Sequence, residues 1–138
     1  MLKRIRRVGW WHVGVRDPES VAEHSLRVAQ LAALIAVIEG AEPGRAALLA
    51  IWHDSQETHT GNIPHTAKPY LHQHSPEAHC TKDADKLECL IQAIEYQDAG
   101  YTRVQGWINS ARSNLRTDTA RRIADAALRT SPLAWRGR

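Results

Sequence analysis

The 138-residue sequence predicts an all-α fold, a compact bundle of about five to six helices. Apolar residues recur three and four positions apart along most of the chain, which is the spacing of amphipathic helices. No segment shows the strict alternation of apolar and polar residues that is typical of a strand. At this length we expect one domain over residues 1–138, with a core at about 18–100 and C-terminal helices at 104–130.

The first helix is expected to begin after Asp17 and to end at Gly40. Pro18 suits its first position and Glu19 its first turn. His24 falls on the apolar stripe of this helix, so its side chain should point into the core.

The second helix is expected from near Pro43 to about Thr58. His53 lies on its apolar face, and Asp54 is rotated from His53 by about 100°. Glu57 comes one helical turn after His53. The pair His53-Asp54 should therefore reach one cavity from the end of this helix. Trp52, directly before the pair, is expected in the core.

Ser75 and Pro76 should open a third long helix that closes at Gly100. Asp85 lies beside the apolar face of this helix. Two further helices are expected at about 104–115 and at about 118–130, the second capped by Thr117.

Cysteine usage and charge indicate a cytoplasmic protein. Cys80 and Cys89 are nine residues apart on one expected helix, which places them on opposite sides and predicts reduced thiols. The N-terminal residues lack the apolar run of a secretory signal, so none is expected. No stretch is expected to span a bilayer. The formal net charge of +3 is concentrated at the two ends, which fits a solvated basic surface or, less directly, an anionic ligand.

Ionisable residues interrupt three of the apolar segments, where burial is costly unless they are paired. One divalent metal would satisfy two imidazoles and two carboxylates together, and Mn, Fe, Co, Ni, Zn and Mg all suit such a set. The carboxylate of Glu57 is placed to transfer a proton beside it. The expected metal ligands are His24, His53, Asp54 and Asp85.

The order H…HD…D of these ligands resembles the signature of the HD-domain metal-dependent phosphohydrolases. Longer strings resemble more narrowly the branch with the bacterial 5′-deoxynucleotidases and their eukaryotic relatives. These strings are RVGW at 7–10, PESVAEHS at 18–25, HDSQE at 53–57, TGNIP at 60–64, Lys68, and KDADKLEC at 82–89.

The resemblance implies an HD-domain helical bundle that holds one divalent metal and removes phosphate from a nucleoside 5′-monophosphate or a related nucleotide-like phosphomonoester. It implies Glu57 and Asp54 as catalytic residues. It also implies a homodimer. From the sequence itself we expect a nucleotide-like small molecule as partner, no membrane, and nucleic acid less than the small molecule.

The sequence departs from the family pattern where substrate is expected to bind. Asn62 stands where relatives carry an acid, which keeps an acceptor but loses the charge. Val13 replaces an arginine, and His12 or Arg16 is expected to supply the missing cation. Sixteen residues separate Lys68 from Asp85, far fewer than in relatives. We therefore expect this chain to share the family's reaction more closely than the family's substrate.

The expected substrate contacts are Trp10, His12, Asn62 and Lys68. Trp10 either stacks on a base or covers the core, and the sequence leaves both open. Lys68 either neutralises a phosphate or is a solvated loop residue.

Three further functions stay open from the sequence: a nucleoside triphosphate phosphohydrolase, a di-iron HD-type oxygenase and a non-catalytic module that binds nucleotide. The di-iron enzyme would need extra histidine ligands, for which ordinary surface histidines are the simpler explanation. The candidates are His59, His65, His72, His74 and His79.

Overall fold

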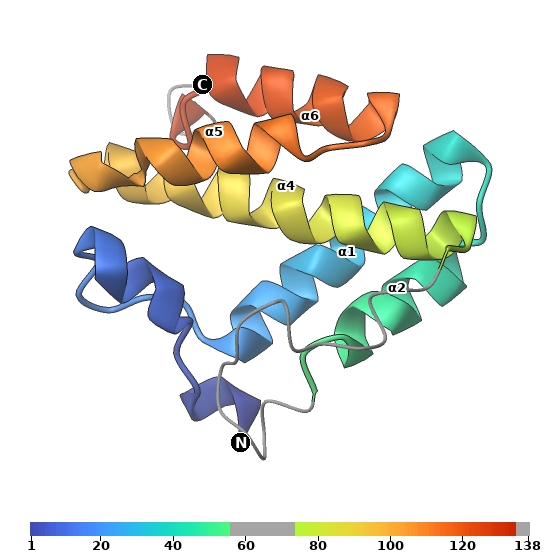
Figure 1. Ribbon diagram of the computed structural model, residues 1–138, viewed down its shortest axis with the longest axis horizontal. Coiled ribbons are helices and arrows are strands. Elements are labelled where there is room, and N and C mark those ends of the chain that lie inside the picture. The colour runs from blue at the N-terminus through green and yellow to red at the C-terminus, as the bar shows by residue number, and fades with distance from the viewer. Residues whose placement is uncertain (56–73, 135–138) are drawn as a thin grey trace.

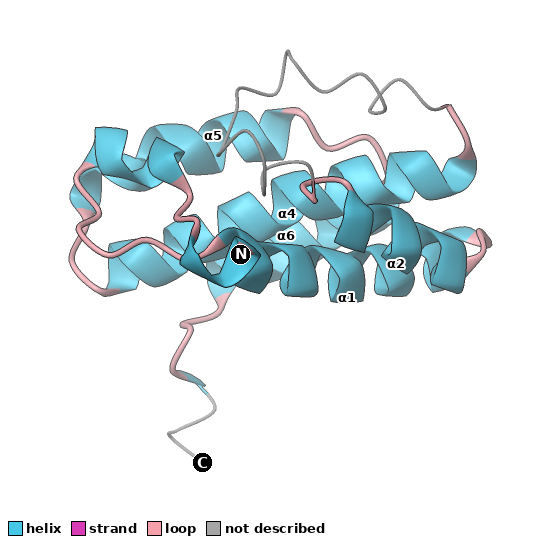
Figure 2. Cartoon of the chain, turned by 90° about the horizontal axis from the view of Figure 1, so that it is seen from below, coloured by secondary structure: helices cyan, strands magenta, loops and turns pink. Residues whose placement is uncertain are grey.

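The structure is a computed structural model that describes residues 1–55 and 74–134. The described residues are helical and contain no strand, apart from an isolated bridge between Arg6 and Ser20 (Figure 2). This confirms the predicted all-α class. The α-helices are α1 (Val21–Glu39), α2 (Pro43–Trp52), α4 (Pro76–Asp98), α5 (Gln105–Ser113) and α6 (Asp118–Arg129). The 3-10 helices are η1 (Leu2–Arg4), η2 (Val8–Val13) and η5 (Thr102–Val104).

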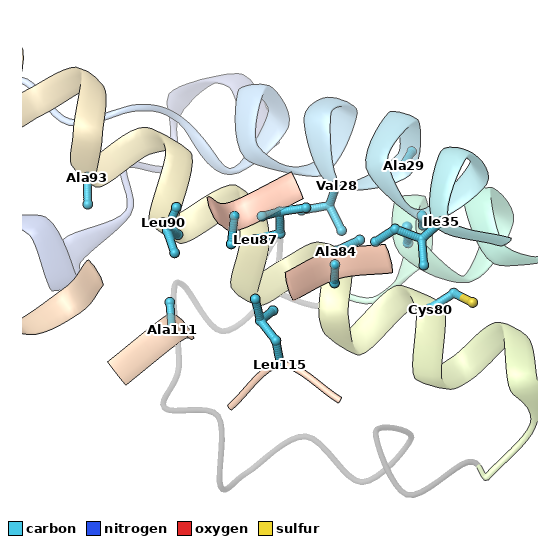
Figure 3. Close-up of a cluster of buried hydrophobic side chains, with 14 of the residues drawn as sticks. Val28, Ala29, Ile35, Cys80, Ala84, Leu87, Leu90, Ala93, Ala111 and Leu115 are labelled. Atoms are coloured by element: carbon cyan, nitrogen blue, oxygen red, sulfur yellow. The ribbon is translucent and has the colours of Figure 1, made fainter. Parts of the chain in front are cut away.

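Helix α4 lies at the centre of the bundle, with α1 and α2 on one side and α5 and α6 on the other (Figure 1). The core that joins these helices includes Val28 of α1, Leu87 and Leu90 of α4, and Ala111 of α5 (Figure 3). Leu87 and Leu90 are completely buried, which stabilises the fold by about 1.5–3 kcal/mol for each side chain. The packing fixes α1 and α4 side by side, and each carries one of the expected ligands.

Helix α1 begins at Val21, three residues later than a start after Asp17 would give. The preceding residues are held extended against the N-terminus, because Arg7 donates a backbone hydrogen bond to Glu19 and Val21 donates one to Ile5. Ser20 then forms a capping box with Glu23, in which each side chain bonds the other residue's backbone amide. Glu19 therefore precedes the helix, and its side chain is buried rather than exposed in a first turn.

Helix α2 ends at Trp52, and His53 is its C-cap. The end expected near Thr58 was wrong, since a turn closed by Ser55 follows the helix. The core placement of Trp52 was also wrong, because its side chain is 62% exposed. Ala46 and Ala50 form the buried face of α2, and Trp52 is rotated from Ala50 by about 200°.

The remaining helices confirm the prediction closely. Ser75 caps α4 through the amide of Ala78, and Thr117 caps α6 through the amide of Ala120. Cys80 and Cys89 are both buried free thiols on α4, as their spacing predicted.

Helix α1 is long and apolar enough to cross a membrane by length and composition, contrary to the expectation that no stretch would be. Its buried side chains include Val28 and Ile35, which belong to the core cluster with residues of α4. Core helices of soluble proteins satisfy the same criterion, and the buried face of α1 packs in this way, whereas Leu34, Val37 and Ile38 on its other side are exposed.

Candidate metal centre

The structure brings the four expected ligands together from three helices. His24 lies near the start of α1, His53 and Asp54 follow the end of α2, and Asp85 lies in the middle of α4. All four are buried, with His24 completely inaccessible. This convergence depends on the packing of α1 and α2 against α4.

The distances between the ligand atoms suit one metal ion. Nε2 of His24 lies 3.0 Å from Oδ1 of Asp85 and 3.5 Å from Oδ2 of Asp54. Nε2 of His53 lies 3.3 Å from the same Asp54 oxygen and 3.6 Å from Oδ1 of Asp85. An ion that binds nitrogen and oxygen at about 2.0–2.2 Å places neighbouring ligand atoms roughly 3.0–3.6 Å apart. His24, His53 and Asp85 thus form a group that could hold one divalent cation, and Oδ2 of Asp54 approaches both imidazoles of that group.

Hydrogen bonds at the outer nitrogens orient both imidazoles. Nδ1 of His53 donates to the backbone carbonyl of Ala50, which can only accept. Nδ1 of His24 lies 2.5 Å from Oε2 of Glu88, whose pKa is lowered to about 2 despite its burial, because of the bond to His24 and of nearby cations. Glu88 is thus ionised and also accepts. Both Nδ1 atoms carry a hydrogen, so each imidazole in its neutral form presents the Nε2 lone pair to the ligand cluster.

The cluster favours a positive charge at its centre. Burial and the Arg7 charge lower the pKa of His24, but its hydrogen bonds with Asp85 and Glu88 outweigh them and raise that pKa to about 9. Burial acts to raise the pKa of Asp85, while hydrogen bonds from His24 and His53 bring it well below the ordinary value. A cation of either kind, a proton or a metal, is stabilised by these carboxylates.

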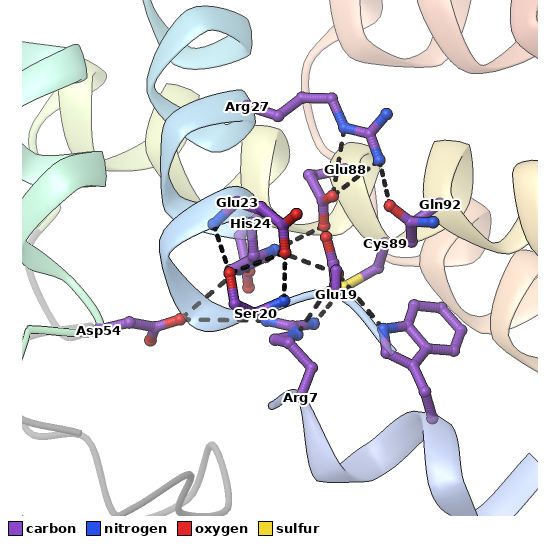
Figure 4. A network of polar contacts seen from close by, with 12 residues as sticks. Arg7, Glu19, Ser20, Glu23, His24, Arg27, Asp54, Glu88, Cys89 and Gln92 are labelled. Carbon is purple, nitrogen blue, oxygen red and sulfur yellow. Dashed lines mark hydrogen bonds and ion pairs between the residues drawn. The ribbon is translucent and has the colours of Figure 1, made fainter. Parts of the chain in front are cut away.

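A second set of charged side chains surrounds the ligands, and the sequence patterns did not reveal it (Figure 4). Arg27 donates to Oε1 of Glu88 at 3.0 Å and to Oε1 of Glu95 at 2.6 Å. Glu88 was detectable in principle, since it is a buried acid three residues after Asp85 and lies in the KDADKLEC string.

Arg7 links the ligand cluster to its surroundings from the N-terminal segment. Its Nη1 lies 3.9 Å from Oδ2 of Asp54, and its Nη2 donates to Sγ of Cys89 at 3.0 Å. Its Nε lies 3.7 Å from Glu19. Burial and the Glu88 charge raise the pKa of Glu19 to about 7, although Arg7 acts to lower it. Arg7 therefore places one positive charge between the carboxylates of Asp54 and Glu19.

A second group with metal-ligand chemistry consists of His24, Glu88 and Cys89. Its atoms are already engaged, since His24 bonds Glu88 and Cys89 accepts from Arg7. Burial raises the pKa of the Cys89 thiol to about 12, which disfavours the thiolate a metal needs. This group supports the orientation of His24 rather than a second metal.

Trp10 is a core residue, which corrects its assignment as a substrate contact. Its side chain is completely buried, and its Nε1 donates to Oε1 of Glu19 at 3.3 Å. Its ring packs edge-on against Tyr96 and, at 4.6 Å between centroids, against Trp107. The sequence left open whether Trp10 stacks on a base or covers the core, and in the structure it covers the core.

The remaining expected site residues are placed as follows. His12 is exposed on η2, and Arg16 is exposed after it. His74 is exposed and His79 is half-buried, and neither belongs to the metal-ligand groups found among the described residues. The expected residues Glu57, Asn62, Lys68, His59, His65 and His72 lie outside the described residues.

The N-terminal half of the chain matches a known protein family. Residues 1–75, more than half of the chain, match the 5′-deoxynucleotidase YfbR-like family. The chain belongs to this family. The matched residues include His24, His53 and Asp54, and Asp85 lies beyond them.

Curated relatives include 5′-deoxynucleotidases. One from Danio rerio is 30% identical over 131 aligned positions, which take in 70% of this chain and 65% of the relative. One from Vibrio parahaemolyticus is 46% identical over 97 positions, which take in 66% of this chain and 46% of the relative. The chain thus spans about two thirds of the first relative's length and less than half of the second's. The alignment has more positions than the residues of this chain that it covers. The Danio rerio protein therefore has additional residues within the matched region.

Solved structures match over nearly the whole chain. A conserved hypothetical protein from Pyrococcus furiosus is 31% identical, with a TM-score of 0.77 and 94% of each chain covered. A coding region from Archaeoglobus fulgidus is 32% identical, with a TM-score of 0.73, and the match covers 97% of this chain and 90% of that one. The compact helical arrangement is therefore shared with chains of similar extent.

Proposed function

We propose that the chain is a phosphohydrolase that removes phosphate from a nucleoside 5′-monophosphate or a related nucleotide-like phosphomonoester, using one divalent metal. The observation that carries the proposal is the orientation of the two imidazoles, whose Nε2 atoms face two carboxylate oxygens within 3.6 Å. Membership of the 5′-deoxynucleotidase YfbR-like family supports the choice of reaction and substrate class.

His24, His53, Asp54 and Asp85 would hold the metal, which Mn, Fe, Co, Ni, Zn or Mg would suit. When bound, such an ion lowers the pKa of water and polarises a phosphoryl oxygen. The chain's own groups prepare the site for this chemistry. Glu88 and the Ala50 carbonyl keep both imidazoles in the ligand tautomer.

Proton transfer is assigned to Glu57, with Asp54 acting through the metal it would hold. Glu57 follows His53 by four residues, and its carboxylate would take a proton from water or give one to the leaving oxygen. Arg7 keeps a fixed positive charge 3.9 Å from Asp54, which offsets the carboxylate charge at this end of the cluster.

The test is phosphate release from nucleoside mono- and triphosphates with Mn, Co, Mg and Ni each added. We expect orthophosphate from monophosphates, and Glu57→Ala should keep its metal while losing rate. Asp98→Asn, at an exposed carboxylate at the end of α4, is the matched control and should keep full activity. Full activity in Glu57→Ala would reject the role of Glu57, and no turnover with any metal would favour a non-catalytic nucleotide-binding module.

The phosphate assay and a metal analysis together separate the triphosphatase and the oxygenase from this function. Hydrolysis of nucleoside triphosphates in preference to monophosphates would indicate the nucleoside triphosphate phosphohydrolase, and two irons per chain with oxygen consumption would indicate the oxygenase. Asn62→Asp tests the sugar: a gain on ordinary deoxynucleotides would mean that Asn62 selects a different one. An unchanged rate would mean that Asn62 does not face substrate.

We also propose that the protein is a homodimer in the cytoplasm. Exposed large apolar side chains on α1 and α2 support an interface with a second copy, and the separated thiols of α4 support a reducing compartment. The apolar side chains are Leu34, Val37, Ile38, Leu48, Ile51 and Trp52. Light scattering should give twice the chain mass for the wild type and a single chain for Ile51→Lys. A monomeric wild type would overturn the dimer.

A further inference from the structure

A cavity of about 440 Å³ opens between η2, α4 and α5. Its volume is within the range of small-molecule sites, which is about 300–1,000 Å³. Its lining includes Val13, Lys86, Cys89, Arg103, Trp107 and Ser110. No sequence motif assigned a ligand to this place.

The cavity is linked to the surroundings of the metal centre through Cys89 and Arg7. Lys86 follows the ligand Asp85 directly, and Cys89 accepts the hydrogen bond of Arg7. The other end of the same guanidinium lies 3.9 Å from Oδ2 of Asp54. One wall of the cavity thus continues into the shell of residues around the ligands.

Charge distinguishes this cavity from two others of similar size. Lys86 and Arg103 line it, and none of its described lining residues is acidic. A cavity of about 460 Å³ beside α1 is lined by Arg6 and Arg27 but also by Asp17, Glu19 and Glu23, so its cations are accompanied by acids. A cavity of about 490 Å³ between α5 and α6 contains no residue of the ligand shell among its described lining residues.

Arg103 brings a cation to the segment that contains Val13. Gly14 has a φ of +88°, and a Cβ built there would lie 2.8 Å from Nη2 of Arg103. The guanidinium therefore lies directly against the backbone of the residue next to Val13. His12 and Arg16, the cations expected to replace the missing arginine, are not among the described lining residues.

Trp107 gives the cavity an aromatic wall. Its ring is half-buried and packs on Trp10, which lies completely inside the protein. Trp107 of α5, which lies outside Trp10, can therefore make the aromatic contact that the sequence assigned to Trp10. Aromatic side chains contact nucleobases favourably whatever the base.

We propose that this cavity binds the nucleotide, with Arg103 and Lys86 pairing with its phosphate and Trp107 contacting its base. The inference rests on the proposed function for the identity of the ligand. Two cations without a competing acid suit a phosphate dianion, and a guanidinium can bind it through two hydrogen bonds.

Binding to the full-length, metal-loaded protein tests the proposal without turnover. The probe is the 5′-methylenephosphonate analogue of deoxyadenosine monophosphate, titrated by calorimetry, with deoxyadenosine as the probe that lacks phosphate. Arg103→Gln should weaken phosphonate binding by about tenfold or more, since it removes a charge-assisted hydrogen bond, and should leave deoxyadenosine binding unchanged. Trp107→Leu should weaken both probes by about tenfold, and Trp107→Phe should restore most of the loss.

Arg112→Gln is the matched control, because Arg112 is an exposed arginine of α5 that lines the cavity beside α6 instead. It should bind both probes as the wild type does. Wild-type affinity for the phosphonate in Arg103→Gln would overturn the proposal, as would failure of the wild type to bind the phosphonate.

A pair of glycines isolates the contact between Arg103 and the backbone. Gly14 and Gly40 both have positive φ, at +88° and +75°, but a Cβ at Gly40 meets nothing within 4 Å. Alanine at either position should lower the melting temperature through backbone strain. Only Gly14→Ala should also weaken phosphonate binding, because it displaces the guanidinium. Equal binding in the two variants would contradict the proposal.

Different results would reject the proposed nucleotide cavity and the proposed reaction. Phosphate release that is insensitive to Arg103→Gln would reject the cavity and leave the phosphohydrolase standing. Binding of the phosphonate that depends on Arg103, with no phosphate released from nucleotides under any metal, would support the cavity and reject the reaction.

Discussion

The two histidines of the cluster present the same atom to it, but different parts of the molecule hold them. Nδ1 of His53 bonds the carbonyl of Ala50, three residues earlier on the same helix. Nδ1 of His24 bonds Glu88, which is 64 residues away on α4 and is itself held by Arg27. One imidazole is oriented by a helix end, and the other by a buried ionic network.

This difference separates what is local in the site from what depends on tertiary packing. The orientation of His53 follows from the end of α2 and cannot be removed by changing a side chain. The orientation of His24 requires α1 and α4 to pack correctly and a charged pair to stay buried. A carboxylate partner also increases the basicity of an imidazole more than a carbonyl does, so His24 should be the stronger ligand.

The largest effect should come from removing either imidazole. His24→Ala and His53→Ala should each abolish metal retention, because each takes one imidazole from the group of His24, His53 and Asp85. Metal content after dialysis, measured by plasma mass spectrometry, checks this. His12→Ala, at an exposed histidine, should keep its metal. Full metal content in either ligand variant would disprove the shared cation.

Glu88→Gln should have the next largest effect, since it acts on His24 alone. The amide oxygen still accepts from Nδ1, but the charge is lost, and changes to such partners weaken metal binding by about 10–100-fold. The measurement is a competition titration against a chelator. Glu95→Gln, which also contacts Arg27 but not His24, is the control and should bind metal as the wild type does. An unchanged affinity in Glu88→Gln would mean that the carboxylate is not what sets His24 apart.

The convergence of the expected ligands could be predicted from sequence because each lies in a short local pattern. His24, His53, Asp54 and Asp85 are ionisable residues in or beside apolar helical stripes, where burial demands a partner. Their convergence then followed from the helices themselves. The ends of α1 and α2 were less predictable, because backbone bonds from the N-terminal segment, rather than Pro18, decide where α1 begins.

The surroundings of the ligands were not predictable, because they depend on contacts between distant segments. Trp10 matched a family string, yet Trp107, nearly a hundred residues later, packs outside it and lines the cavity. Arg103 approaches Gly14 only because η5 and η2 are neighbours in space. Spacing along one helix carries no information about such pairs.

Arg27→Met should have a smaller effect on the metal than Glu88→Gln. Methionine keeps much of the arginine's apolar packing but removes the hydrogen bonds that hold Glu88, Gln92 and Glu95. Because Glu88 keeps its bond to His24, we expect a loss of about 1–2 kcal/mol in the free energy of unfolding, measured by urea denaturation. Metal affinity should fall by less than in Glu88→Gln. A larger fall would move the orienting role from the carboxylate to the guanidinium.

Ser20→Ala should leave metal affinity nearly unchanged, although Ser20 caps the helix that carries His24. The side chain of Ser20 accepts from the amide of Glu23 at 3.2 Å, and losing such a cap costs about 1 kcal/mol of stability. Ser75→Ala removes the equivalent cap from α4, where Ser75 accepts from Ala78 at 3.1 Å, and should cost a similar amount. Urea denaturation and the chelator titration together decide the matter. If Ser20→Ala weakened metal binding far more than Ser75→Ala, the start of α1 would orient His24 locally, and the two histidines would be held in the same way after all.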